Sequence, residues 1–155
     1  DILTHIDTLE ESHQQYAHHI VRQHEIDDAS NAMWIDGAEQ FVGKLVNAGI
    51  PTAIVTRNCR EATNIKLTNN QVPIDTVITR EDGSAKPDPA TLISLQKRWQ
   101  IPAPQLAYIG DYLYDIQAAI SAGMIACLFT PGQVPDYADL ADVVFSDYKE
   151  LAELL

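Results

Sequence analysis

The sequence predicts an α/β fold in which parallel strands form a sheet with helices against its faces. From residue 50 onward, short apolar runs alternate with helical segments of about ten residues, a pattern that implies right-handed crossovers between parallel strands. Several of these runs end in polar residues just before a helix, at the sheet edge where open α/β folds bind ligands. A length of 155 residues fits one domain with a substantial core.

The N-terminal part, residues 1 to about 31, is predicted to be helical and rich in polar residues. Four apolar residues are expected on one helix face: Ile2, Leu3, Ile6 and Leu9. All five histidines lie within residues 5–24, where we expect isolated surface side chains because metal sites show tighter ligand spacing. The segment Gly37–Asn47 predicts an amphipathic helix that stops at Gly49.

The rest of the chain is predicted to alternate strands with helices. The expected strands are Ile50–Val55, Asp75–Ile78, Leu106–Ile109, Ile125–Phe129 and Val143–Phe145. The expected helices are Cys59–Asn69, Pro89–Trp99, Tyr112–Ala122 and Tyr148–Leu155. The only boundary that the pattern indicates lies near residues 31 to 37, where the polar helical segment gives way to this alternation.

Composition excludes several classes of function. A formal net charge of −12 argues against a nucleic-acid surface, which needs clustered Lys and Arg. No apolar run approaches the length that spans a bilayer. The two thiols, Cys59 and Cys127, form no ligand-spaced cluster, which favours a reduced cytoplasmic setting over a disulfide scaffold. We therefore expect a cytoplasmic protein with no nucleic-acid or membrane partner, and the sequence leaves its oligomeric state open.

The most informative stretch runs from Leu106 through Gly110 and Asp111 to Ala119. It predicts a parallel strand that presents Asp111 at its C-terminal edge, with Asp115 in the first turn of the next helix. Such a carboxylate pair suits Mg²⁺, which prefers one or two carboxylates together with waters and phosphate oxygens. The alternative is that Asp111 caps the helix and Asp115 is solvated, and the pair alone leaves both interpretations open.

Two other segments carry polar groups that could meet this pair. Thr56 ends an apolar strand just before a helix, whose unpaired amides and positive dipole end favour a phosphate. Lys86 lies in a loop whose backbone is fixed by Pro87 and Pro89, so its ammonium can be held against a phosphoryl group. Taken singly, Thr56 could be a simple helix cap and Lys86 a solvated loop lysine.

The order Thr56, Lys86 before Pro-Asp-Pro, and Gly110-Asp111 followed by Asp115 resembles the haloacid dehalogenase-like phosphatase superfamily in its second, third and fourth motifs. The resemblance covers roughly residues 37 to 145 and is closest to the phosphoglycolate phosphatase-like branch. It implies a Rossmann-like core over residues 36–155 and a helical cap segment over residues 1–35.

The resemblance also implies roles for individual residues. Thr56 and the adjacent amides, in Arg57 and Asn58, would bind the phosphoryl oxygens of a small phosphorylated substrate. Lys86 would neutralise the phosphate and an aspartyl-phosphate intermediate. Asp111 would be a Mg²⁺ ligand, and Asp115 would support the metal's waters or orient Lys86.

The first motif of the family, Asp-x-Asp-Gly-Thr, which supplies the nucleophile and the general acid/base, is absent from residues 1–155. The nearest sequence, around Asp7, has His5 at the nucleophile position, lacks the glycine and follows no strand. In the family this strand lies between those ending in Thr56 and Asp111, and its loss would leave two unpaired strand edges. We therefore expect the strand and the nucleophile upstream of Asp1.

Three functions are weighed on this basis. The first is a Mg²⁺-dependent phosphomonoester hydrolase, and the second is an inactive member of the family that binds or regulates. The third is a phospho-acceptor receiver domain, which ranks lower because receivers place their acidic residues before the Thr and Lys. A dehalogenase is possible within the family, but Lys86-Pro87 with the Asp111 motif favours metal-assisted phosphate chemistry.

Overall fold

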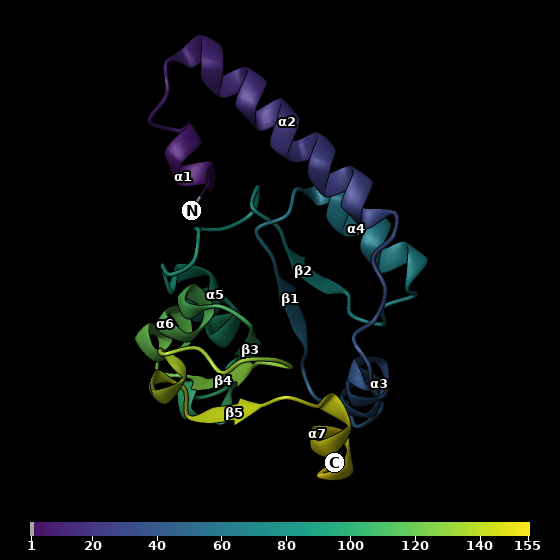
Figure 1. Cartoon of the computed structure of the whole chain (residues 1–155). Helices are drawn as coiled ribbons and strands as arrows, with labels where there is room; N and C mark the ends of the chain where they lie inside the picture. Colours follow the sequence, from purple (N-terminus) through teal and green to yellow (C-terminus); the bar gives the residue numbers. More distant parts are fainter. Residues whose placement is uncertain (1) are drawn as a thin grey trace.

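The computed structural model describes residues 2–155 of the chain (Figure 1). Its α-helices are α1 (Ile2–Ile6), α2 (Glu11–Ala29), α3 (Ala38–Asn47), α4 (Arg60–Asn69), α5 (Ala90–Trp99), α6 (Leu113–Ala122) and α7 (Tyr148–Glu153). Its strands are β1 (Ala53–Val55), β2 (Thr76–Ile78), β3 (Ala107–Gly110), β4 (Ile125–Phe129) and β5 (Val143–Phe145). Two short 3₁₀ helices, η1 (Ala103–Gln105) and η2 (Ala138–Leu140), complete the described elements.

The strands form two parallel sheets. β1 pairs with β2, and a second sheet has the order β3-β4-β5. Figure 1 shows the two sheets apart, with β1 on one side and β3 on the other. Within residues 2–155 no strand joins β1 to β3. The prediction of parallel pairing in an α/β fold is confirmed. The gap between the two sheets lies between β1 and β3, where the sequence analysis expects a further strand.

Most predicted elements are confirmed, with small shifts at their ends. Strand β1 begins at Ala53, later than expected, because Pro51 has no N–H to donate to a neighbouring strand. Helix α3 is followed by Gly49 in a left-handed conformation, with φ of 70°, as expected for a stop signal. Cys59 lies just outside α4 as its N-cap rather than inside the helix. The cap boundary at residues 35/36 stays a prediction.

The core lies where helices α5 and α6 pack against the β3-β4-β5 sheet (Figure 1). Ile116 of α6 and Leu128 of β4 are the largest completely buried side chains among the described residues. Burying such side chains contributes roughly 1.5–3 kcal/mol each. Because α6 is fixed by this core, its N-terminal turn, which carries Asp115, is held firmly beside the end of β3.

The N-terminal helices contact the rest of the chain mainly through α2, which runs along α4 (Figure 1). The expected apolar face of α1 is only partly right, because Leu3 and Ile6 are buried whereas Ile2 is 64% exposed. His18 lies 3.3 Å from a carboxylate oxygen of Asp7, and the other histidines are exposed. No helix in the described part of the chain combines the length and apolar character needed to cross a bilayer.

Candidate functional site

A pocket of about 280 Å³ lies at the C-terminal end of β3. It is lined by Arg57, Lys86, Asp111, Tyr112, Tyr114 and Asp115. The fold thus brings together four of the residues predicted to form the site from three separate segments of the chain. The other two predicted residues, Thr56 and Asn58, flank Arg57 in the sequence but do not line the pocket.

The turn between β3 and α6 depends on Gly110. A Cβ atom on this residue would lie 2.2 Å from the Cβ of Asp115, so only glycine lets that side chain fold back against the strand. Asp115 Oδ2 accepts a hydrogen bond of 3.1 Å from the amide of Tyr112, which is the N-cap of α6. The alternative interpretation, with Asp111 as the cap and Asp115 solvated, is therefore wrong, since Tyr112 is the cap and Asp115 is buried.

Lys86 and Asp115 form a largely buried ion pair in the pocket wall. Lys86 Nζ lies 2.5 Å from Asp115 Oδ1, and the two side chains are 18% and 6% exposed. Tyr108 completes the group, with its hydroxyl 3.3 Å from Asp115 Oδ1 and its ring centroid 5.9 Å from Lys86 Nζ. Burial, and then the charge of Asp115, raise the pKa of Tyr108, which keeps it a neutral donor. Asp115 thus uses both carboxylate oxygens within the protein.

Asp111 is in a different position from Asp115. It is exposed, and within residues 2–155 its carboxylate takes part in no hydrogen bond or ion pair. Its backbone carbonyl accepts a 3.5 Å hydrogen bond from the hydroxyl of Tyr137. The described residues contain no cluster of three or more His, Cys, Asp or Glu side chains able to hold a metal. The carboxylate available to a hard cation is therefore that of Asp111, a donor set that fits an ion bound mainly through waters and phosphate oxygens.

The loop after β1 is held by its own hydrogen bonds. The amide of Thr56 donates to the carbonyl of Ile78 over 2.9 Å, and Thr56 Oγ1 accepts from the amide of Asn58 over 3.1 Å. These contacts fix the loop that carries Arg57 into the pocket. They also give the Thr56 hydroxyl a partner within its own turn, as a Thr near a helix start often has.

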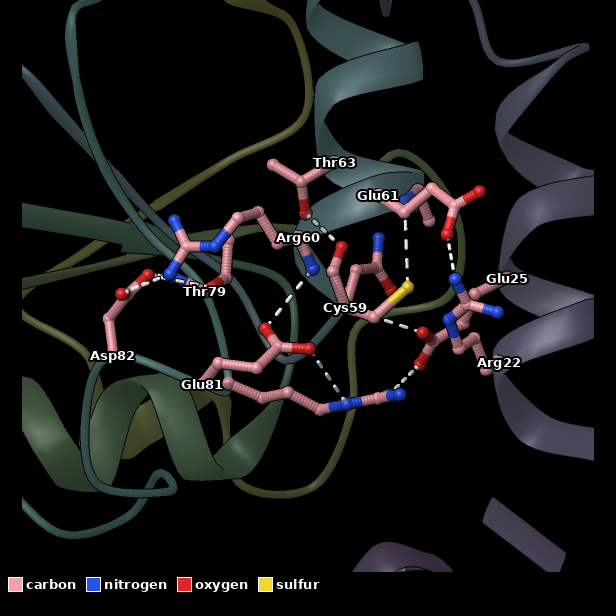
Figure 2. Close-up of polar contacts among 12 residues, drawn as sticks. Arg22, Glu25, Cys59, Arg60, Glu61, Thr63, Thr79, Glu81 and Asp82 are labelled. Atoms are coloured by element: carbon pink, nitrogen blue, oxygen red, sulfur yellow. Dashed lines mark hydrogen bonds and ion pairs between the residues drawn. The ribbon is translucent and has the colours of Figure 1, made fainter. Parts of the chain in front are cut away.

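The start of α4 differs from expectation. The amide of Cys59 donates to Glu25 Oε2 over 2.9 Å, and the amide of Arg60 donates to Glu81 Oε2 over 3.1 Å (Figure 2). The expectation that this helix start offers unpaired amides to a phosphate is therefore wrong for these two residues. Protein carboxylates complement the positive end of the helix instead.

The pocket also contains a guanidinium and two aromatic rings, which belong to Arg57, Tyr112 and Tyr114. Burial, followed by the nearby charge of Arg80, lowers the pKa of Arg57 from its ordinary value, yet a guanidinium stays protonated in proteins. The two tyrosine rings meet edge to face, with centroids 5.2 Å apart. The sequence analysis did not single out these tyrosines. The signal that could have identified them is their position between Asp111 and Asp115, on either side of Leu113.

Comparisons with known proteins identify relatives of this chain. The family model described as haloacid dehalogenase-like hydrolase matches residues 1–129. A haloacid dehalogenase-like hydrolase domain-containing protein of Arabidopsis thaliana is 29% identical over 129 residues, which cover 83% of this chain and 53% of that protein. The chain thus spans about half the length of this curated relative. A probable phosphoglycolate phosphatase of Pseudomonas savastanoi is 46% identical over 43 residues, or 28% of this chain and 26% of that protein.

Solved structures agree on the fold. The crystal structure of a predicted phosphoglycolate phosphatase from Haemophilus somnus superposes with a TM-score of 0.81 at 21% identity, and the match covers 94% of this chain and 68% of that one. The family model matches 129 of the 155 residues, and this match identifies the family. The chain belongs to the haloacid dehalogenase-like hydrolases.

Proposed function

We propose that the protein is a Mg²⁺-dependent phosphomonoester hydrolase that acts on a small phosphorylated metabolite through an aspartyl-phosphate. The observation that carries the proposal is the pocket in which Lys86 and Arg57 lie beside the exposed carboxylate of Asp111. Phosphoryl transfer needs positive charge around the phosphoryl oxygens and a metal ligand next to them, because its catalysis is mostly positioning and charge neutralisation. The similarity to proteins described as phosphoglycolate phosphatases supports this choice.

Each residue has a role in this proposal. Lys86, oriented by Asp115, neutralises the phosphoryl group, and Arg57 adds a second positive charge. Thr56 and Asn58, whose amides donate to the Ile78 carbonyl and to the Thr56 hydroxyl, hold the loop that presents Arg57 to the phosphoryl oxygens. Asp111 holds Mg²⁺, which when bound supplies Lewis-acid polarisation of the phosphoryl oxygens. Since both oxygens of Asp115 already have protein partners, we assign it to orienting Lys86, the second of its two expected roles, rather than to binding the metal directly.

The attacking carboxylate belongs to the first motif, which residues 1–155 do not contain. Neither carboxylate of the pocket suits the attack, since Asp115 is paired with Lys86 and Asp111 is assigned to the metal. The experiment therefore uses the protein that contains this chain. It is assayed against p-nitrophenyl phosphate with Mg²⁺ or with EDTA. We expect hydrolysis with Mg²⁺, its loss in EDTA, and its loss in Asp111→Asn and Lys86→Ala.

A second candidate function is an inactive family member that binds an anion or a metal for regulation. The pairing of Asp115 with Lys86 beside Arg57 favours it, because these charged groups can hold an anion in the pocket without attacking it. This candidate predicts that inorganic phosphate binds in the pocket without any turnover of phosphomonoesters. Hydrolysis that disappears in Asp111→Asn would exclude it.

A further inference from the structure

Glu25 of helix α2 bridges two groups beside the loop that follows β1 (Figure 2). Its Oε2 accepts a 2.9 Å hydrogen bond from the amide of Cys59, and its Oε1 lies 2.5 Å from Arg80 Nη1. The Glu25 and Arg80 side chains are 16% and 15% exposed, so this ion pair is largely withdrawn from water. Charge-assisted hydrogen bonds in such surroundings are stronger than neutral ones.

Arg80, the partner of Glu25, also holds the loop that follows β1. The backbone amide of Arg80 donates to the carbonyl of Asn58 over 3.4 Å, while the Arg80 side chain contacts Glu25. The loop residues Asn58 and Cys59 are thus fixed by one arginine and one glutamate that also fix each other. Arg57, which lines the pocket, directly precedes these two residues.

We propose that Glu25 is a positioning residue for phosphate binding, acting from α2 on the loop that presents Arg57 to the pocket. The proposal rests on the proposed function, since it concerns the same pocket. With Glu25 in place, the Cys59 amide and the Arg80 guanidinium both have a carboxylate acceptor. Without it, the Cys59 amide loses its acceptor and the nearly buried guanidinium is left with the more distant carboxylate of Glu81, 3.8 Å from its Nε, so the loop must rearrange to satisfy both groups.

Other contacts between α2 and α4 provide a comparison, because they join the same two helices without touching the loop. Arg22 pairs with Glu61, and Asp28 lies 2.7 Å from Lys66. These side chains are more exposed, at 49% and 50% for the first pair and 72% for Asp28, and such pairs contribute little. If Glu25 served only to attach α2, removing Asp28 would have a similar effect, and this makes Asp28→Asn a matched control.

The test uses ¹⁵N-labelled protein as wild type, Glu25→Ala, Glu25→Gln and Asp28→Asn. Inorganic phosphate is titrated and followed by the amide signals of the loop. Hydrogen exchange of the Cys59 amide is measured relative to that of Leu128, a fully buried residue of β4 that reports on global unfolding. We expect Glu25→Ala to weaken phosphate binding and to speed relative exchange at Cys59 by about tenfold each, as for one charge-assisted hydrogen bond.

Glu25→Gln keeps a carbonyl acceptor for the amide, so its exchange at Cys59 should lie between those of wild type and Glu25→Ala. Asp28→Asn should stay within about twofold of wild type in both measurements. The proposal is overturned if Glu25→Ala binds phosphate like wild type, or if Asp28→Asn weakens binding equally. If the wild-type protein does not bind phosphate, the proposed function is refuted but the role of Glu25 in positioning the loop is not. Hydrogen exchange of the Cys59 amide then decides whether Glu25 positions the loop.

Discussion

Asp111 and Asp115 are four residues apart in the sequence, yet the structure predicts opposite consequences when each is replaced by asparagine. Asp115 is 4% exposed, pairs with Lys86 at 2.5 Å and accepts from the amide of Tyr112 at 3.1 Å. Asp111 is exposed, and no described side chain hydrogen-bonds its carboxylate. The substitution removes one negative charge in both cases and changes the side-chain volume little, so the two variants form a matched pair.

The size of the stability loss expected for Asp115→Asn follows from the burial of its ion pair with Lys86. Removing one partner of a buried ion pair costs about 3–5 kcal/mol, because the other charge is left without compensation. Lys86 keeps some access to water, at 18% exposure, and asparagine retains an oxygen that can accept from Tyr112. We therefore expect Asp115→Asn to lower the free energy of unfolding by about 2 kcal/mol, which corresponds to a decrease in Tm of roughly 4–8 °C for a chain of this size. Asp111→Asn should stay within about 0.5 kcal/mol of wild type.

Urea unfolding followed by the fluorescence of Trp34 and Trp99 measures both free energies, and thermal unfolding followed by circular dichroism gives the Tm. Phosphatase activity should fall in both variants, but only Asp115→Asn should lose stability. Equal stability of the two variants would refute the assignment of Asp115 to a buried pair with Lys86. A destabilised Asp111→Asn variant would contradict the exposure of that carboxylate.

Three further predictions concern single residues. Gly110→Ala places a methyl group 2.2 Å from the Cβ of Asp115, so we expect loss of phosphate binding and a lower Tm than wild type, both measured on purified protein. Gly43→Ala, in the interior of α3 with open space around it, should instead raise the free energy of unfolding in urea by about 0.5–1 kcal/mol. A hydrogen bond from the Thr79 side chain is the largest cause that lowers the pKa of Asp82 from 3.8 to about 2, so its stabilisation is complete above pH 4 and is lost as the pH falls toward 2. Acid titration of unfolding should therefore show a smaller loss of stability in this range for Asp82→Asn, and an unchanged profile would contradict the prediction.

The sequence alone was sufficient for the types of the elements and for most of their ends. Periodicity is a local property, so the alternation after residue 50 identifies strands and helices without knowledge of their partners. The spacing of Gly110, Asp111 and Asp115 likewise predicts a strand end, a turn and a helix start, and the structure has all three. The stop at Gly49 is also local, because it depends only on the left-handed conformation of one residue.

The tertiary structure decided which partners the charged side chains have. Lys86 is 29 residues from Asp115, and Glu25 is 34 residues from Cys59, so no local pattern reveals either contact. Burial then separates residues that look alike in sequence: Asp115 becomes a buried partner of Lys86, while Asp111 stays exposed. The same reason explains the start of α4, where Glu25 and Glu81 occupy amides that the sequence leaves open for a phosphate. The strength of a charge depends on its distance from other charges and from water, and the fold alone sets both.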